Sequence, residues 1–455
     1  MGVVNTAREP ATVLVRGASL AGMACAARLA RLGHHVVLDA DGLPDAGHWA
    51  AGLHLGVEVD QLPQTFRLPA TWRDLFTKTG RPLPPELERR GLQMVEAPPQ
   101  LHRFADGRLF ALPSERGAQH AAVEQAFGAA AAQRWTGLLD ELDELWMALR
   151  PMGLEEPFRP ERLDRQRRAA LMAQTSLDDL SERSGAPHLA RIVRSQGALS
   201  GAAPGRNPAL LAVTLAVHRR FGSWQVADAQ ARPLRASTMV DLLGRRLDLR
   251  GVERTGSPTP LLGSGLPDLS RISTAPRLEA DARVEALPAQ PTGFAGRRIG
   301  RPALAPTVRH QLLDETPGWL VEHQRQNPSA PPGIVELVDH SAGAPVVSWY
   351  RPLPDGRLAV TVHNHNEPRP DICWGLSATN FKGWAARPLV QAAAGDGPPL
   401  WRASAASHAG HQPWAELLTA ALASYEVHEH LTGQDVRPSN RTPPKLARQA
   451  RPRIR

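Results

Sequence analysis

A stretch near the start of the chain most constrains what it can fold into. Thr12–Val15 is a short β-branched and apolar run, Gly17–Gly22 is a turn of small residues, and Met23–Leu32 carries a helical pattern that stops at Gly33. A second extended run begins at His34. A strand, turn, helix and strand within about thirty residues is the size of one dinucleotide-binding βαβ unit. The sequence therefore predicts an α/β fold with a Rossmann-like unit at this point.

The turn between the first strand and the helix carries the candidate cofactor-binding residues. Such a turn needs a first glycine for a sharp bend, a small middle residue so that a pyrophosphate can approach, and a last glycine for close helix packing. Gly17 and Gly22 take the outer positions, and Ser19 stands at the middle one, where its hydroxyl can donate to a phosphate. The helix N-terminus adds free N–H groups. We predict a dinucleotide site, against the alternative of a chance α/β turn, at Gly17, Ala18, Ser19, Leu20, Ala21 and Gly22.

The second strand is expected to end in an acid that hydrogen-bonds the adenosine ribose. Counted from the turn, that position is Ala40, with Asp39 and Asp41 on either side. Either aspartate requires a one-residue shift, and a strand's side chains alternate between its faces. Asp39 and Asp41 are therefore both candidate ribose ligands.

The composition is typical of a globular enzyme-sized protein. A chain of 455 residues can bury a large core and is expected to form two interleaved domains. The two cysteines, Cys25 and Cys373, are expected to be buried small apolar residues in a reducing, cytoplasmic compartment. Residues 1–10 are polar, which argues against a signal peptide, and no apolar run of about eighteen residues occurs. The net charge of +8 comes from arginines scattered among acids, which does not favour nucleic-acid binding.

Further along, the chain alternates extended and helical patterns. Phe104–Glu115 reads as two extended pieces joined by a turn at Asp106-Gly107. Residues 121–150 predict an amphipathic helix whose acids face solvent and form no catalytic carboxylate pair. Trp414–His430 carries a second helical stripe that stops at Gly433. The arginine- and proline-rich tail beyond it predicts disorder and would allow weak contact with acidic lipid headgroups.

Histidines gather in the last third of the chain, at His363, His365, His408, His411, His428 and His430. Pairs two or three residues apart can ligate a metal, but no cysteine or acid has the spacing of a metal site. We therefore interpret these histidines as polar surface residues and predict no metal site.

After the first unit, a G-x-x-x-D segment leads to a proline-rich turn and to a helix ending in glycine, at Gly56, Asp60, Pro63, Pro69 and Gly80. In the order of these segments the chain resembles the phytoene desaturase-like branch of the flavin amine-oxidase superfamily. An F-x-D-G hairpin like Phe104–Gly107 and a helical substrate domain come next, and the chain returns to the flavin domain through a tract like Ala198–Val226.

The resemblance implies a Rossmann-like FAD-binding domain interleaved with an α+β substrate domain. It predicts the FAD-binding domain at residues 1–85, 223–300 and 396–433, the substrate domain at 86–222 and 301–395, and a basic tail at 434–455. It also implies an FAD-dependent oxidoreductase that transfers a hydride from an apolar substrate, such as an isoprenoid, to the flavin. No side chain is singled out as catalytic, because the cofactor would carry the reaction.

Several positions depart from the family pattern. Ser19 and Ala40 replace a glycine and the ribose acid, and an arginine-bearing glycine pair expected within 45–51 is absent. The glycine pair expected after Trp224 and the proline-glycine core expected before Trp414 are absent as well. A flavin monooxygenase of class A is a nearby variant, although its G-D pair before the final helix is not evident. The alternative of another class is a non-catalytic homologue that keeps the fold to bind an apolar ligand or a partner.

Overall fold

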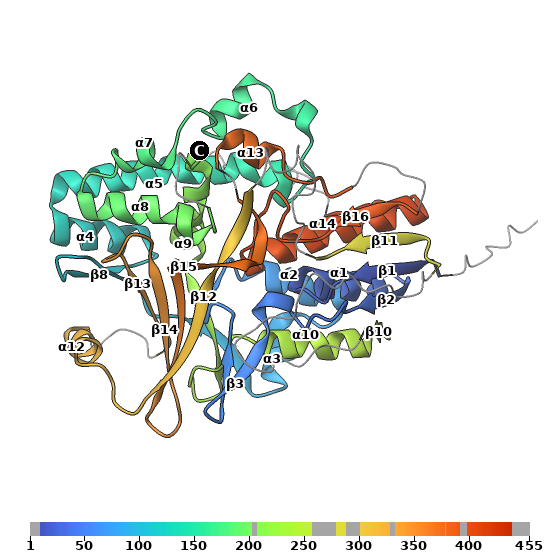
Figure 1. The fold of residues 1–455 in the computed structure, drawn as a ribbon, viewed down its shortest axis with the longest axis horizontal. Coiled ribbons are helices and arrows are strands. Elements are labelled where there is room, and N and C mark those ends of the chain that lie inside the picture. Colours follow the sequence, from blue (N-terminus) through green and yellow to red (C-terminus); the bar gives the residue numbers. More distant parts are fainter. Residues whose placement is uncertain are drawn as a thin grey trace, which may run out of the picture.

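The computed structural model describes residues 10–202, 207–256, 279–287, 301–327, 333–377, 379–391 and 398–438, with only the backbone described at 301, 302 and 370–376. These residues form a parallel sheet with its helices, a layer of helices, and a long mixed sheet (Figure 1). In this part of the chain, no helix combines the length and the apolar character that crossing a membrane requires.

The parallel sheet confirms the predicted Rossmann-like fold. Its strand order is β10-β2-β1-β11-β16, and every neighbouring pair is parallel. The strands are β1 (Thr12–Arg16), β2 (His35–Asp39), β10 (Glu253–Thr255), β11 (Ala282–Glu285) and β16 (Leu400–Arg402). They come from widely separated parts of the sequence, so the chain leaves this domain and returns to it more than once.

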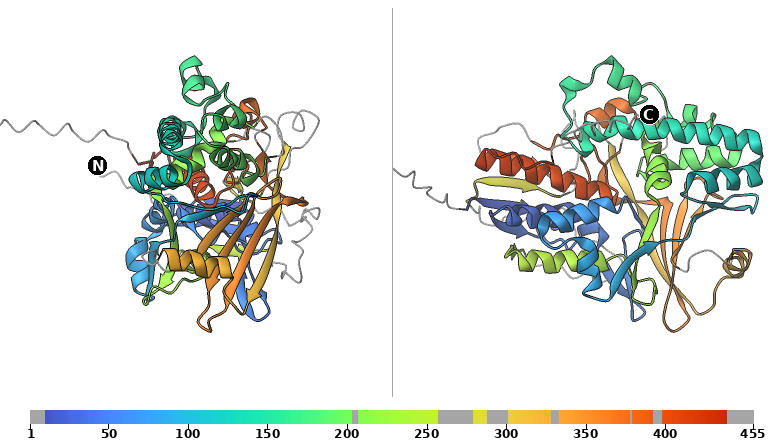
Figure 2. Two further views of the ribbon diagram at one scale, coloured as in Figure 1. Left: turned by 90° about the vertical axis from the view of Figure 1, so that its left-hand side faces the viewer. Right: turned by 180° about the vertical axis from the view of Figure 1, so that it is seen from behind.

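Helix α1 (Leu20–Arg31) connects β1 to β2, as the βαβ pattern predicts. Its first ten residues are all buried, because it packs against α2 (Ala70–Thr79), α10 (Thr238–Leu249) and α14 (Pro413–Thr432). Figure 2 shows α1 and α14 running side by side. Cys25 lies on α1 with no exposed surface, as predicted, whereas the side chain of Cys373 is outside the described residues.

The helical layer lies beside the mixed sheet (Figure 1). It consists of α4 (Arg116–Phe127), α5 (Ala129–Leu149), α6 (Arg165–Ala170), α7 (Leu177–Ser181), α8 (Pro187–Leu199) and α9 (Val213–Phe221). The predicted apolar stripe of α5 forms the centre of its core, at Leu138, Leu139, Leu142, Leu145, Trp146 and Leu149. The short helix α13 (Phe381–Ala385) joins the core of this layer through Phe381 and Trp384, whereas α3 (Leu83–Glu88) and α12 (Gly318–Gln326) lie elsewhere (Figure 1).

The mixed sheet has the strand order β12-β15-β14-β13-β7-β8. Its strands are β7 (Gln100–Arg103), β8 (Leu109–Leu112), β12 (Arg301–Leu313), β13 (Val335–Asp339), β14 (Val346–Pro352) and β15 (Leu358–Ser377). The antiparallel pair of β7 and β8 confirms the predicted hairpin at Asp106-Gly107. Smaller sheets join β3 (Ala51–His54) to β4 (Val57–Asp60), and β9 (Ser223–Asp228) to β5 (Phe66–Arg67) and β6 (Leu92–Glu96).

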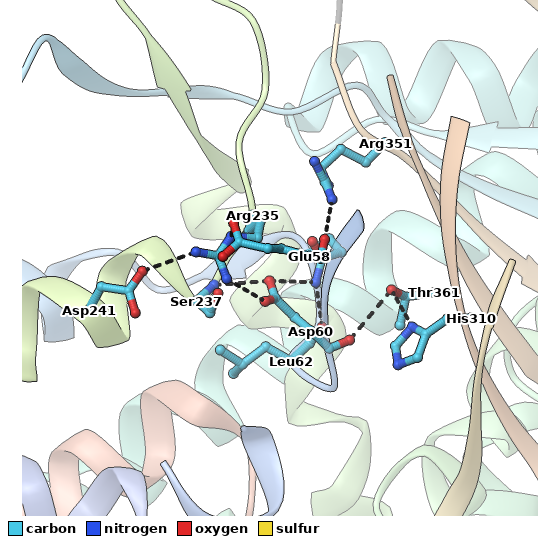
Figure 3. A network of polar contacts seen from close by, with 10 residues as sticks. Glu58, Asp60, Leu62, Arg235, Ser237, Asp241, His310, Arg351 and Thr361 are labelled. Carbon is cyan, nitrogen blue, oxygen red and sulfur yellow. Dashed lines mark hydrogen bonds and ion pairs between the residues drawn. The ribbon is translucent and has the colours of Figure 1, made fainter. Parts of the chain in front are cut away.

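A polar network around Asp60 connects the Rossmann-like domain to the mixed sheet (Figure 3). The Asp60 carboxylate is 1% exposed and accepts a hydrogen bond of 3.0 Å from the backbone N–H of Ser237, at the start of α10. Arg235 pairs with Glu58 at 3.2 Å, and Arg351 of β14 donates to the Glu58 carbonyl at 2.9 Å. The G-x-x-x-D aspartate therefore has a structural role at the junction of the two domains.

The start of the predicted tail is ordered, so that part of the prediction is wrong. Gly433 ends α14 with φ 76°, as expected, but Arg437 then folds back onto the helix. Its guanidinium pairs with Glu426 at 3.0 Å, and also with Glu429 and Asp435. Ion pairs thus hold residues 434–438 against α14, and residues 439–455 lie outside the described part.

Candidate cofactor and ligand site

The turn between β1 and α1 lies at the carboxyl edge of the parallel sheet, where open α/β sheets bind their ligands. Gly17 has φ +103°, and its N–H donates to the Asp39 carbonyl at 2.7 Å. A Cβ on Gly22 would lie 2.0 Å from the Gly17 carbonyl oxygen and 2.9 Å from Ala286 Cβ. Both glycines are thus required by the turn itself, which has the close approach of strand and helix expected of a dinucleotide fold.

Ser19 has a structural role in this turn. Its hydroxyl donates to the Ala286 carbonyl at 2.7 Å and accepts from the Gly22 N–H at 3.1 Å, so it caps α1 and ties it to the end of β11. The side chain is buried. The Ser19 hydroxyl, which the sequence predicts as a donor to a phosphate, therefore donates to a backbone carbonyl in this structure.

The two candidate ribose ligands differ in their surroundings. Asp39 is the last residue of β2, and its Oδ1 accepts from the Asp41 N–H at 3.1 Å. Asp41 lies beyond the strand with φ 50°, and its carboxylate pairs with Arg16 at 3.2 Å. Asp39 lies at the end of its strand, where a ribose acid is expected, whereas the Asp41 carboxylate forms an ion pair with Arg16.

Glu416 is a site residue that the sequence analysis missed. It lies in the first turn of α14, and its carboxylate reaches the N-terminus of α1, where Oε2 accepts from the Ala21 N–H at 3.4 Å. Oε1 accepts from the Trp49 indole N–H at 2.8 Å, and His48 Nε2 lies 3.7 Å away. The Glu416 residue is only 1% exposed. A helix N-terminus favours anions, and the Glu416 carboxylate is the anionic group that lies against the N-terminus of α1.

The burial of Glu416 changes its ionisation. Loss of hydration raises the pKa of its carboxyl from 4.5 to about 7, and the hydrogen bonds from Trp49 and Ala21 oppose that rise only in part. Glu416 therefore gains or loses its charge near neutral pH. The glycines and Asp39 fit a dinucleotide, and at the N-terminus of α1 the fit depends on the state of Glu416.

The interpretation of the histidines as surface residues is wrong for most of them, since His363, His408, His411 and His428 are buried. His363 packs edge-on against Trp349, and His408 stacks on Phe158 with ring centroids 4.0 Å apart. Burial lowers the pKa of His363, His408 and His411 to about 3, so these imidazoles are neutral at physiological pH. Within the described ranges, no group of three or more histidines, cysteines and acids could hold a metal ion.

Two hollows border helix α14. A cavity of about 90 Å³ between the Rossmann-like domain and the mixed sheet is lined both by aromatic side chains and by polar ones. The aromatic residues are Trp49, Phe66, Trp72, Trp349 and Trp414, and the polar ones include Arg67, Gln100, Gln196 and Glu336. On its polar wall, Glu336 accepts from Thr65, Arg67 and Gln100. A larger groove of about 750 Å³ runs between α2, α5 and α14, with Trp146, Leu154, Phe221 and Leu418 among its apolar residues.

Similarity to known proteins covers more of the chain in structure than in sequence. No family model matches the chain. A phytoene desaturase from Cercospora nicotianae is 31% identical over 138 residues, which are 30% of this chain and 21% of that protein. The match thus spans about a fifth of the relative's length.

Solved structures resemble nearly the whole chain. Putrescine oxidase bound to putrescine has a TM-score of 0.57 with 13% identity, over 93% of this chain and 99% of that one. Cyclohexylamine oxidase from Brevibacterium oxydans has a TM-score of 0.52 with 15% identity, over the same shares. The chain therefore has the fold of these two solved structures and, over 138 residues, sequence similarity to a phytoene desaturase, in line with the resemblance seen in the sequence.

Proposed function

We propose that this chain is an FAD-dependent oxidoreductase that acts on an apolar substrate. The observation that carries the proposal is the glycine turn between β1 and α1, with Asp39 at the end of the adjacent strand β2. In the proposal, the turn from Gly17 to Gly22 holds the pyrophosphate and Asp39 holds the ribose. When bound, a flavin accepts a hydride from the substrate.

The protein's own residues would exclude water and position the substrate. The smaller cavity combines aromatic and polar side chains, and its volume of about 90 Å³ leaves room for few water molecules. On the polar wall of this cavity, Thr65, Arg67 and Gln100 donate to the Glu336 carboxylate and hold it in place. The local sequence similarity to a phytoene desaturase supports an apolar substrate of the class to which isoprenoids belong.

The alternative is a non-catalytic homologue that binds an apolar ligand. It is favoured by the presence of Glu416 and Trp49 at the N-terminus of α1 and by the larger groove beside α14, which is lined by apolar residues such as Trp146 and Phe221 together with charged ones. FAD binding separates the two functions.

The proposal is tested by FAD titration of the full-length protein, followed by flavin fluorescence and thermal unfolding. Asp39→Asn is expected to weaken FAD binding by about tenfold, the effect of losing one hydrogen bond to a ribose. Asp45→Asn is the matched control, because its exposed carboxylate pairs with Arg254 outside the turn. FAD that neither binds nor stabilises the native chain would contradict the oxidoreductase and leave the ligand-binding homologue.

A further inference from the structure

We propose that Glu416 competes with the phosphates of the cofactor for the N-terminus of α1, so that the cofactor binds when this carboxyl is neutral or has moved away. The inference rests on the proposed function and deepens it by assigning control of cofactor entry to one side chain.

The contacts of Glu416 place it as an internal anion. One carboxylate oxygen accepts from the Ala21 N–H in the first turn of α1, and the other accepts from the Trp49 indole. The N–H groups of a first turn are those that hold pyrophosphate in dinucleotide folds. An ionised Glu416 and a pyrophosphate would therefore use the same donors and would repel each other in a buried place where charges are weakly screened.

The packing of the two helices keeps Glu416 in place. α14 lies along α1, and Ala420, Ala423 and Val427 follow Glu416 on the buried side of α14. Trp49, itself 2% exposed, covers the carboxylate. A carboxylate packed among such residues is costly to bury, so its presence is not explained by stability alone.

Glu416 is the group in this neighbourhood that changes charge near neutral pH. The first turn of α1 carries no acidic side chain, η1 (Gly47–Trp49) contributes His48, and the segment before α14 contributes His411. Burial lowers the pKa of His48 and of His411 to about 3, so both stay neutral across the physiological range. A raised pH would therefore strengthen the competition through Glu416, and a lowered pH would relieve it.

The test is a binding titration of cofactor-free, full-length protein with FAD and, separately, with ADP, which carries the adenosine and diphosphate part alone. The variants are Glu416→Gln, which can still accept from Trp49, and Glu416→Ala, with circular dichroism and thermal unfolding as folding checks. Glu429→Gln is the control, because this residue faces Arg437 on the other side of the same helix. Each protein is titrated at about pH 6 and about pH 8.5, below and above the titration of a carboxyl with a pKa near 7.

Both Glu416 variants are expected to bind ADP and FAD at least about tenfold more tightly than the native chain at the higher pH. The native chain should approach the Gln variant at the lower pH, and Glu429→Gln should follow the native chain. Equal affinities of all proteins at the higher pH would overturn the competition while leaving the proposed function intact. Tighter ADP binding without FAD binding would support the competition and contradict the oxidoreductase, and absence of ADP and FAD binding in every protein would overturn both.

Discussion

Replacing Glu416 by glutamine should stabilise the protein in a strongly pH-dependent way. Burial raises the pKa of this carboxyl from 4.5 to about 7. A group with a raised folded pKa contributes its full stability below the unfolded pKa, and that contribution is lost as the pH rises through the folded pKa. Each pKa unit corresponds to 1.36 kcal/mol, so a rise from 4.5 to about 7 makes the native chain lose about 3 kcal/mol of unfolding free energy once the pH exceeds the folded pKa.

Glutamine cannot ionise, so Glu416→Gln does not undergo this loss. The difference in unfolding free energy between the variant and the native chain should grow by about 1.4 kcal/mol from about pH 6 to about pH 8.5, a range that avoids most of the loss expected from the buried histidines in acid. Urea denaturation followed by circular dichroism measures it, with Glu429→Gln as the control on the same helix. Contributions from the buried histidines are common to both proteins and cancel in the difference. A difference that stays constant with pH would refute the claim that Glu416 is buried at the end of α1.

Three further outcomes are expected. Gly22→Ala places a Cβ 2.0 Å from the Gly17 carbonyl oxygen and should prevent stable folding or FAD binding. The Cβ of Gly33→Ala meets nothing within 4 Å, so this variant should lower the unfolding free energy by only about 1 kcal/mol. Equal effects of the two substitutions in urea denaturation would refute the close turn. Asp60→Ala leaves the Ser237 N–H without its acceptor and should lower the unfolding free energy by about 2–4 kcal/mol, whereas an unchanged urea midpoint would contradict the junction in Figure 3. Burial lowers the pKa of four imidazoles to about 3, at His48, His363, His408 and His411. The stability that these neutral imidazoles contribute above their unfolded pKa of 6.5 should be lost as the pH falls, by about 2 kcal/mol each at about pH 5. A urea midpoint that is equal at about pH 7 and about pH 5 would contradict their burial.

Local patterns predicted much of the fold. The first strand, glycine turn and helix could be predicted because the turn leaves no room for a side chain at Gly22 and because apolar residues dominate α1. The apolar stripe of α5 was predicted for a similar reason, since one face of the helix is buried against its neighbours. These features depend on residues that are close together in the sequence.

The parts of the site that depend on distant residues could not be predicted in this way. Glu416 meets Ala21 across 395 positions of the sequence, and no spacing rule connects them. A signal was present, since Glu416 shares the buried face of α14 with Ala420, Ala423 and Val427, whereas the other two acids of this helix pair with Arg437. The histidines were misassigned for a related reason, because polarity alone predicts exposure, whereas partners such as Phe158 come from elsewhere in the chain.

The most direct test of the account is the visible absorption spectrum of the full-length protein after incubation with FAD at about pH 6 and removal of unbound cofactor. The account predicts the bands of bound oxidised flavin together with a higher melting temperature, as expected for a ligand that binds the native state. A colourless protein with an unchanged melting temperature, in Glu416→Gln as well as in the native chain, would contradict it.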